Sequence, residues 1–311
     1  MSVCRPKRTV ERALCPIAVS VGKVRAWSPG SGRWRWYSLT GRKARQCNVH
    51  NGPDRRWDPM TYLNINGEEL YSEVAGSGDP VLLLHGGFCS LESLRGQSDA
   101  LVADFQVFAF ERSGHGRSAD IDADYSYARG IADTLAYLDA HGLQSVHVIG
   151  YSDGAIIGLM LALKHPERVR SLVAISANLD PAVFSPEADN GPRLDSPPSS
   201  PGEGEATPDL ERMHFGRLSP DGPGHADAVL AKLMRLWTSE PHIDPASLAA
   251  VRAPTLIMSG DRDSIPPAHS LLIAASIPGA QLAIVPGTGH GLNAERPELV
   301  STLIRNFLAH A

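Results

Sequence analysis

Hydrophobic residues follow two alternating patterns from residue 61 onward. Short continuous apolar runs, such as "PVLLLH" at residues 80–85, are typical of strands that are buried on both faces. Longer segments between them carry apolar residues at helical spacing. Strands are predicted at residues 80–85, 105–110, 145–150, 171–176, 254–260 and 281–287, and helices at residues 90–103, 127–141, 153–165, 268–275 and 297–309. This alternation predicts an α/β fold with a mostly parallel central sheet flanked by helices.

Two segments depart from the alternation. Asn66-Gly67 separates the apolar runs 62–65 and 70–74, and Asn-Gly is a strong signal for an antiparallel hairpin. After residue 176, about 77 residues pass before the next strand, far more than an ordinary connection needs. We therefore predict a small lid or cap insertion at about residues 178–250. Its proline-, serine- and glycine-rich part, 185–208, is predicted to be a loop, and 226–237 a helix with one apolar face.

Charge divides the chain near Met60. Residues 1–59 contain 13 lysine and arginine residues and three acidic residues, whereas the remainder has a net charge of −15. The basic segment shows no sustained periodicity, so we predict a disordered extension followed by one domain over residues 60–311. A nucleic-acid or membrane arm, a targeting peptide and a true start at Met60 are the alternatives for residues 1–59. Because the folded part is acidic, we expect no nucleic-acid partner.

The remaining composition narrows the class of protein. No window reaches the 18 or more apolar residues of a membrane helix, so no membrane partner is expected. The four cysteines have neither metal-ligand spacing nor a disulfide pattern, which favours a cytoplasmic protein without a metal site.

The strongest chemical signal is the pentapeptide Gly150-Tyr151-Ser152-Asp153-Gly154. A predicted strand precedes it and a predicted helix follows it, which is the context of a nucleophile elbow. The glycines allow strand and helix to approach closely, and Ser152 stands at a helix N-terminus, where developing negative charge is favoured. The alternative is a serine that merely caps the helix or completes the turn.

A serine nucleophile needs a base and an acid that orients the base, and candidates follow later in the chain. Asp261 and Asp263 come directly after one predicted strand, and His290 after the last one. All three lie at the same edge of the sheet as Ser152. The order nucleophile, acid, histidine favours His290 as the base, with either aspartate as the acid.

Residues 61–311 resemble the α/β-hydrolase superfamily. The motifs that carry the resemblance are "HGG" at 85–87, "ERSGHGRS" at 111–118, "GYSDG" at 150–154, and "GDRD" and "GTGH" at 260–263 and 287–290. The resemblance implies a catalytic triad of Ser152, Asp263 and His290. It also implies an oxyanion hole formed by the backbone N–H groups of Asp153 and Gly87, with Phe88 as the alternative to Gly87.

The resemblance implies a function as well. We expect a serine hydrolase that cleaves carboxylic esters of small molecules through an acyl-enzyme and needs no cofactor. Phe88 is expected to wall the acyl pocket, and the Asp153 carboxylate to pair with a substrate ammonium group if the substrate is an amino-acid ester. Lactone hydrolysis, carbon-carbon bond hydrolysis, a cofactor-free perhydrolase and a non-catalytic binding protein remain alternatives.

Overall fold

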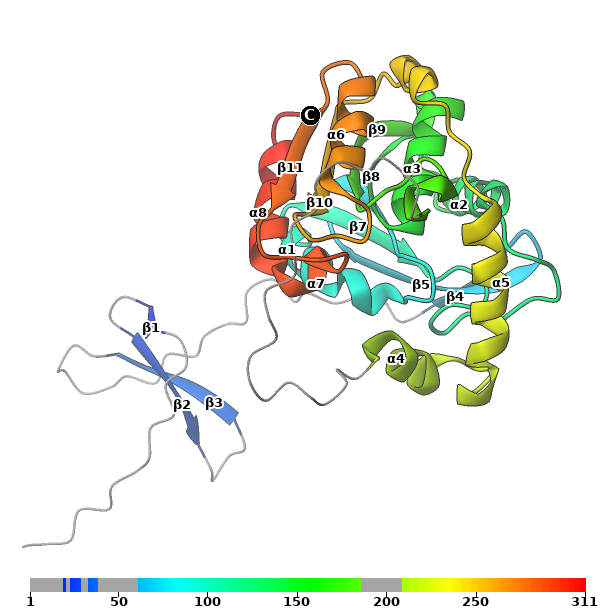
Figure 1. The fold of residues 1–311 in the computed structure, drawn as a ribbon. Coiled ribbons are helices and arrows are strands. Elements are labelled where there is room, and N and C mark those ends of the chain that lie inside the picture. The colour runs from blue at the N-terminus through cyan, green and yellow to red at the C-terminus, as the bar shows by residue number, and fades with distance from the viewer. Residues whose placement is uncertain (1–18, 21–22, 29–32, 39–60, 186–208) are drawn as a thin grey trace, which may run out of the picture. The chain divides into compact units, whose positions relative to one another are not determined.

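An eight-stranded sheet forms the centre of the chain beyond residue 60 (Figure 1). The structure is a computed structural model that describes residues 19–20, 23–28, 33–38, 61–185 and 209–311. The strands are β4 (Thr61–Ile65), β5 (Glu68–Gly76), β6 (Asp79–Leu84), β7 (Phe105–Phe110), β8 (Val146–Tyr151), β9 (Val169–Ile175), β10 (Thr255–Gly260) and β11 (Gln281–Val285).

The strand order is β11-β10-β9-β8-β6-β7-β5-β4, and only β5 runs antiparallel to its neighbours. The predicted α/β class and mostly parallel sheet are therefore confirmed. The predicted hairpin is present as β4 and β5, with Asn66 at φ 53° and Gly67 at φ 93°. Positive φ at both central residues is the geometry that Asn-Gly turns favour. Parallel strands place their carboxyl ends at one edge, where the loops after β8, β10 and β11 meet.

Helices cover both faces of the sheet. They are α1 (Arg95–Leu101), α2 (Tyr127–Ala140), α3 (Asp153–Lys164), α6 (Pro267–Ser276), α7 (Leu292–Glu295) and α8 (Pro297–Leu308), with the 3₁₀ turns η1 (Leu91–Leu94) and η2 (Pro166–Arg168). The predicted helix at 90–103 is divided into η1 and α1. Ser90 begins η1, since its side chain accepts a hydrogen bond from the N–H of Glu92.

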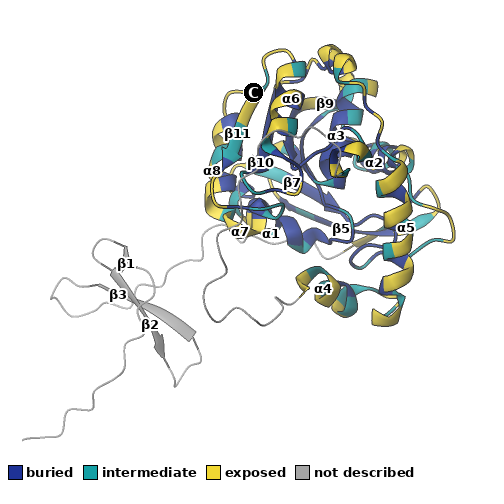
Figure 2. Cartoon of the chain, in the orientation of Figure 1, coloured by how far each residue is buried: buried dark blue, intermediate teal, exposed yellow. Residues whose placement is uncertain are grey.

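The core consists of two apolar clusters, one on each face of the sheet. Leu82 and Leu84 pack into the cluster that includes α2 and α3, whereas Val81 and Leu83 pack into the one beneath α1 and α8. This alternation follows from the two-residue period of a strand. Figure 2 shows that the central strands of the sheet are largely buried.

The segment between β9 and β10 contains the predicted insertion. It comprises η3 (Pro181–Phe184), α4 (Leu210–Leu218), η4 (Pro223–His225), α5 (Ala226–Ser239) and η5 (Pro245–Ala250). The helix predicted at 226–237 is α5, and its buried face contains Val229, Leu233 and Leu236. Helix α4 was not predicted, because Phe215 is its only buried residue and its apolar pattern is weak. Most of the predicted loop 185–208 lies outside the described residues.

Asp120, in the loop after β7, links this insertion to the sheet domain. Its carboxylate accepts hydrogen bonds from Tyr125, from His225 at 2.8 Å and from Lys232 at 2.9 Å. Burial alone would raise the pKa of Asp120, but these hydrogen bonds outweigh it and lower the pKa to about 2. The ionised carboxylate is therefore preferred in the folded protein.

Replacing Asp120 with asparagine is expected to lower the free energy of unfolding at pH 7 by about 2 kcal/mol, because one pKa unit corresponds to about 1.4 kcal/mol. The contribution of Asp120 is fully present above the unfolded pKa of about 4 and is lost as the pH falls toward about 2. Urea unfolding of both proteins at pH 7, 4 and 3 measures the difference. A difference that stays constant over this range would contradict the ionic role.

The basic N-terminal part forms its own unit, since the chain divides into residues 1–54 and 55–311. The strands β1 (Val19–Ser20), β2 (Lys23–Ser28) and β3 (Arg33–Ser38) pair antiparallel within it. No strand was predicted here, although the alternation of Arg33-Trp34-Arg35-Trp36 has the period of a strand. The rest of the predicted extension, and its boundary at residue 59, lie outside the described residues.

Among the described residues, no helix combines the length and apolar character needed to cross a membrane.

Candidate active site

Ser152 lies in a sharp turn between β8 and α3. Its backbone adopts φ 53° and ψ −117°, a conformation that residues with a side chain rarely adopt. A Cβ atom on Gly150 would collide with the backbone of Gly154, and one on Gly154 would collide with the carbonyl of Leu84. Glycine is thus required at positions 150 and 154, because β8 and α3 approach each other closely there.

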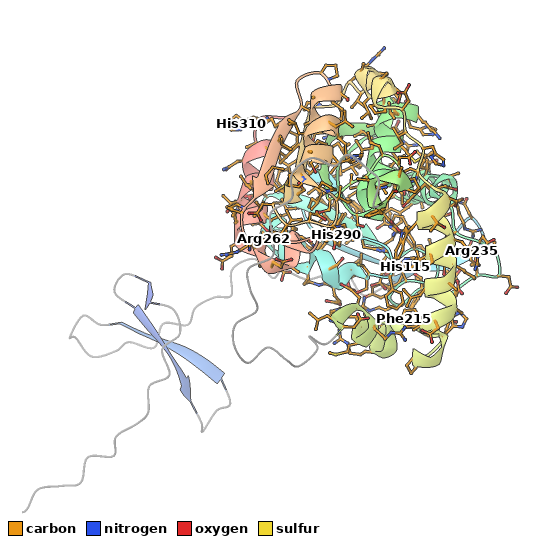
Figure 3. The ribbon with its side chains drawn as sticks, viewed as in Figure 1. His115, Phe215, Arg235, Arg262, His290 and His310 are labelled. Carbon is orange, nitrogen blue, oxygen red and sulfur yellow. The ribbon has the colours of Figure 1, made fainter. Side chains whose placement is uncertain are left out.

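The structure brings His290 and Asp263 to Ser152 from separate loops. His290 follows β11, and its Nε2 lies 3.0 Å from the Ser152 Oγ. Asp263 follows β10, and its Oδ1 lies 2.7 Å from the His290 Nδ1. His290 is labelled in Figure 3, and its side chain is 33% exposed. The imidazole thus connects the hydroxyl to the carboxylate within one hydrogen-bonded chain.

Asp263 is held by several groups besides His290. Ser176 donates a hydrogen bond to its Oδ2 at 2.6 Å, and the N–H of Ile265 donates to its Oδ1 at 3.0 Å. Burial acts to raise the pKa of Asp263, but the hydrogen bonds from His290 and Ser176 prevail and lower it. The carboxylate form is therefore favoured. Ser176, whose backbone has φ 55° directly after β9, was not predicted as a partner of Asp263.

Asp261, the other candidate acid, serves the neighbouring loop. Its Oδ1 accepts hydrogen bonds from the N–H groups of Gly287 at 2.8 Å and Thr288 at 3.2 Å. This side chain supports the segment that leads to His290. Of the two aspartates, the structure brings Asp263 to the imidazole.

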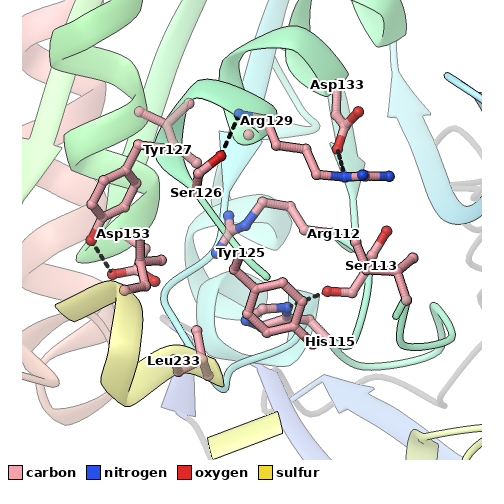
Figure 4. Close-up of a pocket in the computed structure, with 14 residues that line it drawn as sticks. Arg112, Ser113, His115, Tyr125, Ser126, Tyr127, Arg129, Asp133, Asp153 and Leu233 are labelled. Atoms are coloured by element: carbon pink, nitrogen blue, oxygen red, sulfur yellow. Dashed lines mark hydrogen bonds and ion pairs between the residues drawn. The ribbon is translucent and has the colours of Figure 1, made fainter. Parts of the chain in front are cut away.

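Arg112 and His85 fix the loop that carries Gly87. The guanidinium of Arg112 donates to the carbonyls of His85 at 2.8 Å and Gly86 at 3.0 Å. His85 accepts from the backbone N–H of Arg112 at 3.0 Å, and burial together with the charge of Arg112 places its pKa well below the usual value. Both residues belong to the predicted motifs, and both have structural roles here. Figure 4 shows Arg112 near Asp153 and Tyr127.

Ser152 and His290 line a cavity of about 860 Å³. Its aromatic and aliphatic wall contains Phe88, Tyr127, Tyr151, Phe184, Leu230, Met234, Trp237 and Ile265. The predicted oxyanion-hole residues Gly87 and Asp153 border the same cavity. Phe88, the predicted pocket wall, has φ 54° and stacks on Phe215 of α4 with ring centroids 5.3 Å apart. The insertion thus supplies part of the wall around the nucleophile candidate.

The Asp153 side chain has partners that the sequence did not predict. It is 4% exposed and accepts hydrogen bonds from the Tyr127 hydroxyl at 3.0 Å and the Trp237 Nε1 at 3.0 Å. Burial raises the pKa of Asp153, and the charge of Arg112 opposes that effect. The apolar spacing of α5 identified Trp237 as a packing residue, but nothing in that spacing indicates its hydrogen bond.

Within the described residues, no group of three or more histidine, cysteine or acidic side chains is arranged to hold a metal ion.

The chain is similar to several known hydrolases. A protein of Azorhizobium caulinodans named "Putative carbamate hydrolase RutD" is 30% identical over 266 residues, which cover 80% of this chain and 98% of that protein. A 2-hydroxymuconate semialdehyde hydrolase of Pseudomonas putida is 29% identical over 262 residues, which cover 76% of this chain and 89% of the relative.

Solved structures show the same fold. The structure of Est816, described as an N-acyl homoserine lactone degrading enzyme, has a TM-score of 0.65 at 24% identity and covers 79% of this chain and 99% of its own. The sequence also matches the model of the alpha/beta hydrolase family over residues 81–303. The chain therefore belongs to the alpha/beta hydrolase family.

Proposed function

We propose that this protein is a serine hydrolase that cleaves carboxylic esters of small molecules through an acyl-enzyme. The observation that carries the proposal is the position of His290, with Nε2 3.0 Å from the Ser152 Oγ and Nδ1 2.7 Å from Asp263. A base at this distance is able to accept the hydroxyl proton, and the carboxylate fixes the tautomer that leaves Nε2 free to do so.

In the first step, the Ser152 Oγ attacks the ester carbonyl while its proton passes to the His290 Nε2. The tetrahedral intermediate then collapses, the carbon-oxygen bond to the alcohol breaks, and the imidazolium returns its proton to the leaving alkoxide. Asp263 stabilises the imidazolium and remains ionised. This step leaves the acyl group on Ser152 and releases the alcohol.

In the second step, water loses a proton to His290 and attacks the acyl carbonyl, and Ser152 leaves as a hydroxyl after receiving that proton. Negative charge develops on the carbonyl oxygen in both steps. The N–H groups of Gly87 and Asp153 are the proposed donors to this oxygen, and Asp153 also begins α3, whose N-terminus favours negative charge.

The lining of the cavity disfavours an anionic ester. Asp153, Glu211 and Glu240 line it, and none of its described lining residues is lysine or arginine. Burial raises the pKa of Asp153 and of Glu211, so their negative charge is reduced, but no cation faces the substrate from these residues. A cleft with acidic groups attracts cations and repels anions. A carboxylate-bearing substrate, such as a muconate semialdehyde, therefore finds no counter-ion among these residues. This supports ester cleavage over the reaction for which the Pseudomonas putida relative is named.

An amino-acid ester is the less favoured form of the same substrate class. Asp153 was expected to pair with its ammonium group, but Trp237 contacts both carboxylate oxygens, at 3.0 and 3.2 Å, and Tyr127 contacts one of them. An ammonium group would compete with these two donors. The Asp153 carboxylate is better explained as part of the wall, together with the neighbouring lining residues Glu211 and Glu240.

Labelling and turnover together test the proposal. The full chain is treated with a fluorophosphonate probe and mapped by mass spectrometry, and its hydrolysis of p-nitrophenyl butyrate is compared with that of p-nitrophenyl hemiglutarate, which ends in a carboxylate. We expect one adduct, on Ser152, and a kcat/KM roughly tenfold higher for the neutral ester.

Other outcomes separate the alternatives. An adduct on Ser152 with turnover of lactones or carbon-carbon bonds alone would replace the ester proposal by another reaction at the same residues. Absence of both labelling and turnover would favour a binding protein. A faster reaction with hemiglutarate would contradict the charge argument.

A further inference from the structure

Helix α5 reaches the proposed oxyanion hole through the side chain of Trp237. Its indole Nε1 donates to the Asp153 carboxylate at 3.0 Å. A Cβ atom placed on Gly87 would lie 2.5 Å from the Trp237 Cζ2 and 2.5 Å from the Asp153 Oδ2, so both groups pack directly against the Gly87 backbone. One side chain of the insertion therefore contacts both residues whose N–H groups are the proposed donors.

The Asp153 carboxylate has a fixed place between these elements. The Tyr127 hydroxyl, from the first residue of α2, donates to Oδ1 at 3.0 Å, as the dashed line in Figure 4 shows. Trp237 donates from α5, on the side of the insertion. Because Asp153 follows Ser152 directly in the chain, forces on its side chain act on the backbone of the elbow itself.

We propose that Trp237 is a positioning residue through which the insertion sets the oxyanion hole. The inference rests on the proposed serine-hydrolase function. Oxyanion donors act only when they are placed at hydrogen-bond distance from the developing charge, and a displacement of about 1 Å costs roughly 10²-fold in rate. Trp237 holds Gly87 by packing and Asp153 by its hydrogen bond, and so maintains the spacing of the two amides.

Trp237 also lines the cavity, so a role as a simple wall must be separated from positioning. A wall contacts the substrate in the ground state and in the transition state alike, and its loss changes KM. A positioning residue acts on charge that is present only in the transition state, and its loss lowers kcat. Arg235 offers a control because it lies on the same helix but is exposed and is not among the described residues that line the cavity.

The experiment replaces Trp237 with phenylalanine in the full chain, which keeps an aromatic ring and removes the N–H donor. With p-nitrophenyl butyrate we expect kcat to fall about tenfold while KM stays within about twofold. Affinity for a trifluoromethyl ketone, which mimics the tetrahedral oxyanion, is expected to fall about tenfold as well. The control variant Arg235→Lys is expected to retain kcat and ketone affinity within about twofold, because an exposed ion pair contributes little.

A Trp237→Phe variant with a raised KM and an unchanged kcat would overturn the positioning role and leave Trp237 as a wall. If this variant does not fold, Tyr127→Phe removes the other donor to the same carboxylate without changing α5. The same selective loss of kcat is then expected, and an unchanged kcat would overturn the inference. Failure of the wild-type protein to react at Ser152 would instead refute the proposed function itself.

Discussion

Replacing Ser152 with alanine is expected to lower kcat for p-nitrophenyl butyrate by at least about 10⁴-fold, because nucleophile and base act as a unit in such sites. The His290 Nε2 then has no hydroxyl to activate, since its partner at 3.0 Å is the Ser152 Oγ. The fold should persist because the elbow depends on Gly150 and Gly154, where a Cβ has no room, and not on the serine hydroxyl. Steady-state kinetics and circular dichroism measure the two effects.

Ser264 is the matched control for this substitution. Its hydroxyl donates to the Asp263 Oδ1 at 3.3 Å and lies 3.5 Å from the Nδ1 of His290, whereas the Ser152 hydroxyl is next to the Nε2. Ser264→Ala is expected to retain activity within about tenfold, as for the loss of a weak supporting hydrogen bond. Substantial turnover by Ser152→Ala, or labelling that moves to another residue, would refute the assignment of the nucleophile.

Asp263→Asn is expected to lower kcat by about 10⁴-fold with little change in structure. The asparagine amide is similar in size to the carboxylate but removes its charge, so that it neither stabilises the imidazolium nor holds the Nδ1 proton. The Nε2 then carries the proton and is unable to accept one from Ser152. The pH dependence of stability should also change, because the lowered pKa of Asp263 contributes stability that is lost as the pH falls below the usual carboxyl range.

Asp261→Asn is the matched control, because it removes the charge of the other candidate acid. Asp261 accepts two backbone hydrogen bonds from the loop before His290, so its loss is expected to cost about 1–2 kcal/mol of stability and to reduce kcat far less than Asp263→Asn. Parallel kinetics and thermal melts of the two variants measure the contrast. If Asp261→Asn were inactive and Asp263→Asn active, the proposed acid would be reversed.

Much of the fold was predictable because its signals are local. The central strands are buried on both faces and therefore appear as unbroken apolar runs, and the ends of β6, β8 and β10 differ from the predicted ends by at most one residue. The site followed from the same logic. Parallel strands place the loops that follow them at one edge, so Ser152, His290 and either Asp261 or Asp263 were predicted to be neighbours. The family resemblance favoured Asp263 of the two aspartates.

The partners of the site residues were not predictable, because they depend on contacts between distant parts of the chain. Trp237 is 84 positions from Asp153, and Ser176 is 87 positions from Asp263. Helical spacing reports which face of α5 is buried but not what that face contacts. Helix α4 was missed for a related reason, since one buried residue, Phe215, leaves almost no periodic pattern.

The unequal crowding around the cavity has an evolutionary consequence. Backbone atoms surround Gly150 and Gly154 so closely that a Cβ at either position would collide with them. A substitution there would therefore disrupt the turn that carries Ser152. Met234, on α5, is 53% exposed, lines the cavity and makes no part of the sheet core. Substitutions at such positions of α5 alter the shape offered to a substrate without disturbing the reacting groups. We therefore expect substrate preference to diverge by neutral drift at exposed cavity positions of α5 such as Met234, whereas positions 150 and 154 tolerate only glycine.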